Sequence, residues 1–84
     1  MTRHDLKIWP EYFRYTWSGE KAFELRYDDR AYRAGDILNL REWTRQEGYT
    51  GREIEVEVTY LLSGFGLKKD WVVMSFIILH KHDM

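Results

Sequence analysis

The strongest constraint on the fold is a strict alternation of apolar and polar side chains in the segment REIEVEVTYLL, residues 52–62. The apolar positions are Ile54, Val56, Val58 and Tyr60, and the polar positions between them are Glu53, Glu55, Glu57 and Thr59. Alternation with a period of two places successive side chains on opposite faces of a β-strand. We therefore predict a strand here, with its apolar face in a hydrophobic core and its glutamates in water.

Four further segments have the composition of strands. They are residues 4–8, 22–28, 36–43 and 71–80. The alternation in the second segment predicts that Phe23 and Leu25 face the core. By the same alternation, Glu24 and Arg26 belong to the outer face. The last segment, WVVMSFIILH, is continuously apolar, which is typical of a strand that is covered on both faces.

One short helix is predicted between the first two strands, in the segment PEYFRYTWSG. Proline is favoured in the first turn of a helix, so Pro10 marks its start. Glycine easily adopts the left-handed conformation that ends a helix, so Gly19 marks its end. Phe13 and Trp17 lie four residues apart and form the stripe that we expect to face the core.

The order of these elements predicts an α+β fold that is dominated by strands. We expect consecutive strands to pair antiparallel through turns and to curl into a small β-barrel of about five strands, with the short helix beside it. The 84 residues correspond to one domain, residues 1–84. Residues 80–84 are predicted to be a frayed tail, because terminal residues are seldom tied down.

The composition excludes several classes of function. The absence of cysteine excludes disulfide-stapled folds and thiolate metal sites. The 13 basic and 14 acidic side chains give a net charge of −1, whereas a domain that binds a duplex mainly through its phosphates has an excess of Lys and Arg. No apolar run approaches the ~20 residues of a membrane span, and MTRHDLKIW lacks the apolar core of a secretory signal. We therefore expect a cytoplasmic protein that contacts no membrane.

No motif in the chain predicts a metal or a cofactor. His80 and His82 share a strand face, as metal ligands on a strand do, but they have no Cys or H-E-x-x-H partner. The segment SGFGLKK lacks the spacing of a phosphate-binding P-loop. We therefore expect neither a metal nor a cofactor.

Where the predicted helix meets the second strand, the spacing Gly19-x-Lys21-x-x-Glu24-x-Arg26 matches the G-x-K-x-x-E-x-R motif of ASCH domains. Further agreement in HDLKI, LREW, YTGREI and GFG extends the resemblance over residues 4–76. The chain resembles a family of small uncharacterised ASCH-like proteins of phages and bacteria, within the PUA-like superfamily. The resemblance implies a PUA-like β-barrel in which the motif residues face a cleft between the helix and the barrel. In ASCH domains this cleft is a proposed site for RNA or a nucleobase.

The candidate residues for binding RNA or a nucleotide are Lys7, Trp9, Lys21, Glu24, Arg26, Arg30 and Trp43. Arg26 has a planar fork that suits a phosphate or a base edge, and the amine of Lys21 suits a phosphate. Trp9 or Trp43 would stack on a base, and such stacking tolerates a low net charge. Arg30 lies in a loop and is a candidate for contacts with a nucleic-acid backbone. An ordinary structural explanation stays open for each residue: a solvated strand face for the charged residues and a core position for Trp9.

Three functions are compatible with these residues. The first is a module that binds RNA or a nucleotide. The second follows from the resemblance, because some ASCH proteins are small amidohydrolases that deacylate N4-acetylcytidine with the motif lysine, a threonine and a glutamate. Lys21 matches that lysine, and Lys21 and Glu24 would be the catalytic pair, but Glu24 stands where the threonine belongs and the glutamate has no assigned counterpart. The third is a protein-interaction module that presents Tyr12, Tyr15 and Trp17 on the helix.

Overall fold

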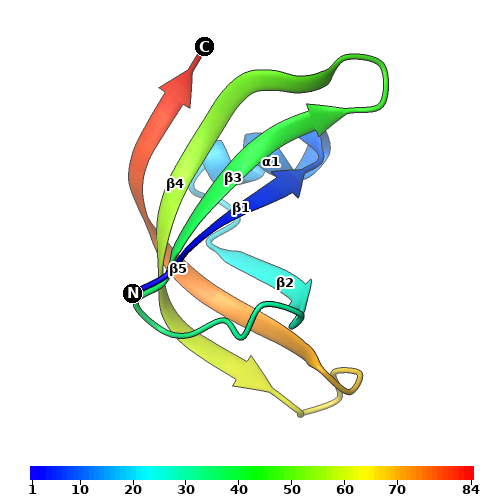
Figure 1. Cartoon of the computed structure of the whole chain (residues 1–84), viewed down its shortest axis with the longest axis vertical. Helices are drawn as coiled ribbons and strands as arrows, with labels where there is room; N and C mark the ends of the chain where they lie inside the picture. The colour runs from blue at the N-terminus through cyan, green and yellow to red at the C-terminus, as the bar shows by residue number, and fades with distance from the viewer.

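In the computed structural model, which describes residues 1–84, five strands and one helix follow one another in the predicted order (Figure 1). The elements are β1 (Arg3–Ile8), α1 (Pro10–Ser18), β2 (Phe23–Tyr27), β3 (Ile37–Thr44), β4 (Gly48–Ser63) and β5 (Trp71–Asp83). The predicted α+β class, dominated by strands and with one short helix, is therefore confirmed. No helix has both the length and the apolar character that a membrane span requires.

All strands form one sheet in the order β1–β3–β4–β5–β2. β4 pairs antiparallel with both β3 and β5, as predicted, but β1 pairs in parallel with β3, and β2 pairs with β5. The prediction that all consecutive strands pair antiparallel is therefore wrong at both edges of the sheet. The chain passes through α1 and β2 between β1 and β3, and parallel pairing requires a long crossover of this kind. The sheet curls into a half-barrel in which β1 and β2 are unpaired edges on its open side (Figure 1).

The helix α1 has the predicted boundaries because single residues determine both of its ends. Pro10 occupies the first turn, where its missing N–H removes no helical hydrogen bond. Gly19 adopts a φ of +88°, and its N–H donates to the carbonyl of Thr16 at 3.1 Å. Phe13 is fully buried in the core and Trp17 packs against it, so this face of α1 covers the concave side of the sheet.

The predicted alternation in β4 places side chains correctly until a β-bulge reverses it. Ile54, Val56 and Val58 are buried in the core, whereas Tyr60, predicted on the same face, is exposed. The register with β5 shifts between Val58 and Tyr60, so one extra residue enters β4. An extra residue reverses which face the following side chains occupy. The alternating sequence continues through the bulge and therefore gives no sign of it.

The strand β5 is covered on one face only. Its inward side chains belong to the core, but Ile77 and Leu79 are exposed on the other face. The prediction that both faces are covered is therefore wrong, because the only helix packs on the concave side. Residues 80–83, for which the sequence predicts fraying, instead continue β5 and pair with β4 as far as Asp83, which lies opposite Arg52.

The side chains of β2 have the opposite orientation to the predicted one. Glu24 is 4% exposed, whereas Phe23 and Leu25 are 46% and 47% exposed. Pairing with β5 determines this orientation, because Glu24 lies opposite the buried Met74 and shares its inward face. The alternation rule assigns the apolar face to the core. Here the inward face of an edge strand opens into a cleft, where charged groups pair with one another.

Asp36 anchors the start of β3 to the start of β1. Its Oδ1 accepts a hydrogen bond from the N–H of Thr2 at 3.1 Å, and its Oδ2 accepts from the N–H of Arg33 and from His4 Nε2, both at 2.9 Å. Burial alone would raise the pKa of the Asp36 carboxyl. The hydrogen bonds from His4, Arg33 and Thr2 outweigh burial and hold this pKa below its usual value. The ionised carboxylate therefore stabilises the folded state.

We expect Asp36→Asn to lower the free energy of unfolding by about 2–3 kcal/mol near pH 7, because an amide NH2 group cannot accept a hydrogen bond at one of the two oxygen positions. Because the folded-state pKa is depressed, the wild-type stabilisation is complete above about pH 5 and is lost as the pH falls below about 4. Urea unfolding of both proteins at about pH 7 and about pH 3 measures the difference, with the exposed Glu47→Gln as control. An equal deficit at both pH values would contradict this role of the carboxylate.

Candidate functional site between β1 and β2

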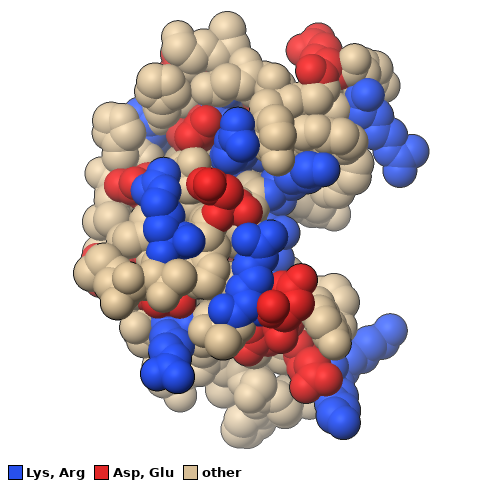
Figure 2. Space-filling model, viewed as in Figure 1, with Lys and Arg blue, Asp and Glu red and all other residues tan.

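A cleft of about 780 Å³ opens between the edge strands β1 and β2, beside α1. Its lining comes from β1, α1 and the connections on either side of it, β2, the loop that follows β2, and the first residue of β5. The aromatic side chains in this lining are Trp9, Tyr12, Phe23, Tyr27, Tyr32 and Trp71. Figure 2 shows the molecule hollowed on the side where β1 and β2 diverge, with Lys and Arg atoms on the walls of the hollow. The cleft is thus the open seam of the half-barrel.

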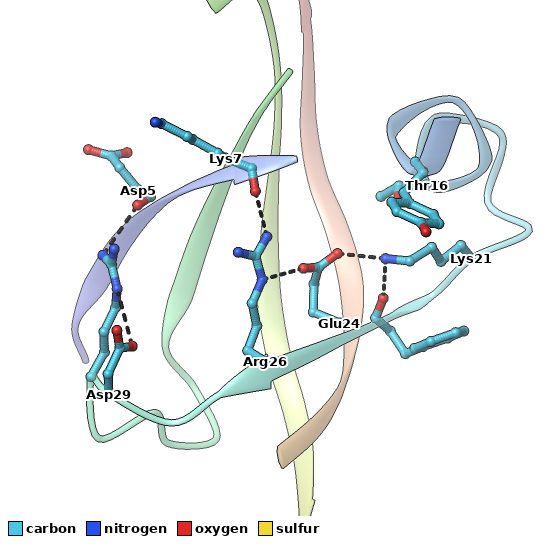
Figure 3. A network of polar contacts seen from close by, with 10 residues as sticks. Asp5, Lys7, Thr16, Lys21, Glu24, Arg26 and Asp29 are labelled. Carbon is cyan, nitrogen blue, oxygen red and sulfur yellow. Dashed lines mark hydrogen bonds and ion pairs between the residues drawn. The ribbon is translucent and has the colours of Figure 1, made fainter. Parts of the chain in front are cut away.

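The carboxylate of Glu24 is the centre of an ion-pair network in this cleft (Figure 3). Its Oε1 accepts a hydrogen bond from Lys21 Nζ at 2.5 Å, and its Oε2 accepts one from Arg26 Nε at 2.7 Å. The Glu24 side chain is buried, whereas both cations are partly exposed. A buried carboxylate is tolerated only when its charge is paired, and here each oxygen has its own cation.

The local sequence explains how the network forms. Gly19 reverses the chain after α1, and the N–H of Lys21 then donates to the carbonyl of Tyr15 at 2.9 Å. This contact holds Lys21 beside the start of β2, where its amine also donates to the carbonyl of Phe23 at 2.7 Å. Glu24 and Arg26 are two positions apart on β2 and therefore share its inward face.

Arg26 and Arg30 connect β2 and its following loop to the unpaired edge of β1. Arg26 Nη2 donates to the carbonyl of Lys7 at 2.7 Å, and Arg30 Nη1 donates to the carbonyl of Asp5 at 3.2 Å (Figure 3). Asp5 and Lys7 are two positions apart on β1, so their carbonyls point in the same direction, away from β3. The two guanidinium groups therefore replace donors that a neighbouring strand would supply.

The remaining predicted residues are Lys7 and Trp9, which line the cleft, and Trp43, which lies next to them outside the lining. Lys7 is part of the lining, but its amine points away from Glu24 (Figure 3) and lies 4.6 Å from the centre of the Trp43 ring. Trp9 is exposed, lines the cleft, and contacts Trp43 edge-to-face with ring centres 5.4 Å apart. Of the predicted binding residues, Trp43 alone lies outside the cleft lining.

Tyr12, Tyr32 and Trp71 line the cleft without having been predicted there. Tyr12 was assigned to a protein-binding face of the helix. Tyr32 is buried edge-on against the His4 ring, and burial raises the pKa of its phenol against the opposing influence of the Arg30 charge. Trp71 reaches the cleft because β5 pairs with β2. No local pattern in the sequence indicates that pairing.

The aromatic residues predicted to form a protein-binding surface on the helix point in different directions. Trp17 packs against the core, beneath the guanidinium of Arg52, which lies 4.7 Å from its ring centre. Tyr12 lines the cleft, whereas Tyr15 is exposed outside it. The three side chains therefore do not form one exposed patch.

His80 and His82 lie on the outer face of β5 with their ring centres 6.5 Å apart. Their partners on β4 are Glu55 and Glu53, and Glu55 is paired with Arg3. No group of three or more His, Cys, Asp or Glu side chains is arranged to hold a metal ion.

We expect Glu24→Gln to lower the free energy of unfolding by about 2–3 kcal/mol, because a neutral amide leaves Lys21 and Arg26 without their counter-charge at a largely buried position. The matched control is the exposed Glu20→Gln, which should change stability by less than about 0.5 kcal/mol. Urea unfolding followed by circular dichroism measures both variants. Similar losses in the two variants would show that the network does not stabilise the seam.

Comparison with known proteins gives this chain a family. Residues 3–76, which include every residue of the cleft, match a family described as a domain of unknown function, DUF3850. The chain is 35% identical over 78 residues to the "Uncharacterized 12.9 kDa protein in GpA 3'region" of Escherichia phage P2. This similarity covers 93% of the chain but 66% of the phage protein, so the chain spans just under two thirds of the length of this relative. The chain belongs to the DUF3850 family.

Proposed function

We propose that this chain is an ASCH-like domain of the PUA-like type, and that it binds RNA or a nucleotide by accepting a nucleobase in the cleft between β1 and β2. One observation carries the proposal: a single cleft combines exposed aromatic rings with a fixed cluster of charged hydrogen-bonding groups. Its volume of about 780 Å³ is within the range of small-ligand sites. The three charged residues of the motif lie together in this cleft, which supports the same class of ligand.

Trp9 and Tyr12 supply the stacking surfaces. Both side chains line the cleft and are exposed, so their rings are accessible to a planar ligand. A base that stacks on an aromatic side chain contributes about 1–3 kcal/mol, and this contribution does not depend on a high positive charge. Stacking therefore reconciles a nucleotide ligand with a net charge of −1.

Glu24 and Arg26 supply the polar groups that would meet the edge of a base. The Glu24 carboxylate has lone pairs beyond the two that its cations use. Arg26 uses Nε and Nη2 within the chain, which leaves Nη1 as a donor. A base edge that presents a donor next to an acceptor matches this pair. Because other contacts already fix both groups, little side-chain entropy is lost on binding.

The cleft is more basic than the chain as a whole. Four basic and two acidic side chains line it, in a chain whose net charge is −1. Arg30 is partly exposed, with its guanidinium 3.8 Å from the carboxylate of Asp29, and provides a cation for a ligand phosphate. This local excess favours an anionic ligand of limited size over a long duplex.

Isothermal titration calorimetry, which measures the Kd for each of the four 5′-mononucleotides and for a short single-stranded RNA, tests the proposal. Two exposed tyrosines of α1 provide a matched pair of variants: Tyr12 is 49% exposed and lines the cleft, whereas Tyr15 is 43% exposed and lies outside it. We expect Tyr12→Ala to weaken binding by about 5- to 150-fold, which corresponds to the loss of one stacking contact. Tyr15→Ala should leave the Kd within about twofold. Absence of saturable binding by the wild-type chain to every ligand would refute the proposal.

Direct contact between Lys21 and Glu24 in the cleft favours, as a second candidate, an amidohydrolase that acts on N4-acetylcytidine. The contacts of Glu24 support an amidohydrolase less well than a binding module, because two cations already engage the Glu24 carboxylate. Thr16, the labelled threonine in Figure 3, is fully buried, and its hydroxyl donates to the carbonyl of Tyr12. This threonine therefore offers no free hydroxyl to the pair.

Incubation of the chain with N4-acetylcytidine, followed by mass spectrometry, separates the two candidates. We expect no cytidine product above that of a sample without protein, because the lysine–glutamate pair lacks the third group of the amidohydrolases. Product that forms with the wild-type chain but not with Lys21→Ala would instead establish the amidohydrolase. Lys69→Ala, an exposed lysine outside the cleft, is the control for the loss of a positive charge.

A further inference from the structure

A strip of alternating cationic and aromatic side chains lies on the outer surface next to the cleft. Its members are Lys7, Trp9, Arg41, Trp43, Arg45 and Tyr49, and we call it the cation–aromatic strip. The amine of Lys7 lies 4.6 Å from the centre of the Trp43 ring, and the Arg41 guanidinium lies 3.7 Å from that of Tyr49. The guanidinium of Arg45 lies 5.7 Å from the Trp9 ring.

Three aromatic rings of this strip follow one another across the sheet. Trp9 precedes α1, and its ring centre lies 5.4 Å from that of Trp43 on β3. Trp43 in turn lies opposite Tyr49 of β4, and side chains of directly paired residues stand on the same face of a sheet. The three rings therefore form a row of neighbouring stacking surfaces.

The strip is continuous with the cleft, because Trp9 and Lys7 belong to both. A strand of nucleic acid with one base in the cleft would therefore meet Trp9 at the rim and the other two rings beyond it. The β3–β4 hairpin, which carries the far end of the strip, lies at the upper right of Figure 1, and Figure 2, in the same view, shows this part of the molecule above the hollow. The strip leads outward along this hairpin.

Two of the three cations of the strip have no ion-pair partner. Lys7 and Arg45 have no carboxylate within salt-bridge distance, whereas Arg41 lies 3.4 Å from the carboxylate of Glu53. Unpaired cations beside exposed aromatic rings are the combination by which proteins bind single strands, with the rings under the bases and the cations at the phosphates. The strip is thus suited to the backbone of a ligand whose base occupies the cleft.

We propose that the ligand is a single-stranded nucleic acid of several nucleotides, with one base in the cleft and the following nucleotides on the cation–aromatic strip. The inference rests on the proposed function, because it assumes that the cleft accepts a nucleobase. It adds the size class of the ligand and a second set of binding residues. A free mononucleotide uses the cleft alone and gains nothing from the strip residues outside it, which are Arg41, Trp43, Arg45 and Tyr49.

Affinity as a function of ligand length tests this inference. The probes are the mononucleotide that binds most tightly and single-stranded RNA homo-oligomers of the same nucleotide, about three and about six residues long. We expect the hexamer to bind at least about fivefold more tightly than the mononucleotide, because one additional stacked base contributes about 1–3 kcal/mol. The logarithm of its binding constant should also fall with the logarithm of salt concentration, by about 0.7 for each phosphate contact.

Arg45→Gln, confirmed as folded by circular dichroism, should remove most of the gain with length and leave the Kd of the mononucleotide unchanged. Trp43→Ala, confirmed as folded in the same way, should reduce the ratio of hexamer affinity to mononucleotide affinity. Arg45 is exposed at the end of β3, so its replacement tests the strip without risk to the core. Lys69→Gln, an exposed cation outside both the cleft and the strip, should have no effect on either ligand. The inference is overturned, while the proposed function stands, if the hexamer binds no more tightly than the mononucleotide. It is also overturned if the Kd of the hexamer is the same for both strip variants as for the wild-type chain. Absence of binding by every ligand overturns both.

Discussion

The arrangement of the cleft depends on the carboxylate of Glu24. This carboxylate pairs with Lys21, which follows α1, and with Arg26 of β2. Arg26 in turn donates a hydrogen bond to the carbonyl of Lys7 on β1. A half-barrel leaves two strands with unpaired backbone groups, and such edges are prone to pair with other chains. In this fold, side chains from one edge bind carbonyls of the other. The seam is thereby stabilised without being closed.

A seam that is joined by ions differs physically from one joined by a backbone ladder. Ion pairs add less stability than apolar packing of the same volume, but their geometry is specific. The charged residues of the seam hold the edges at a fixed separation, and under the proposed function the same residues also present hydrogen-bonding groups to the ligand. Stability and recognition would then depend on one network.

Local features of the sequence could be predicted, whereas features set by distant pairing could not. Pro10 and Gly19 determine the ends of α1 through their own backbone preferences, so the helix was predicted correctly. The inward orientation of Glu24 and the contribution of Trp71 to the cleft depend on the register between β2 and β5, which no local pattern contains. Tyr60 is exposed because of a bulge that the alternating sequence conceals. The motif predicts the charged cluster of the site, whereas alternation alone assigns Glu24 and Arg26 to the outer surface.

The position of β2 at the far edge of the sheet has a consequence for the synthesis of the chain. β2 is held in the sheet by β5 alone, and β5 is the last strand of the domain to be made. A nascent chain that ends before Trp71 already contains every residue of the Glu24 network but lacks the strand that orients them. β1 can rest on β3 and β4 at that stage, with its outer edge still bare. A chain that ends before Trp71 therefore lacks both the pairing partner of β2 and the part of the cleft lining that β5 supplies.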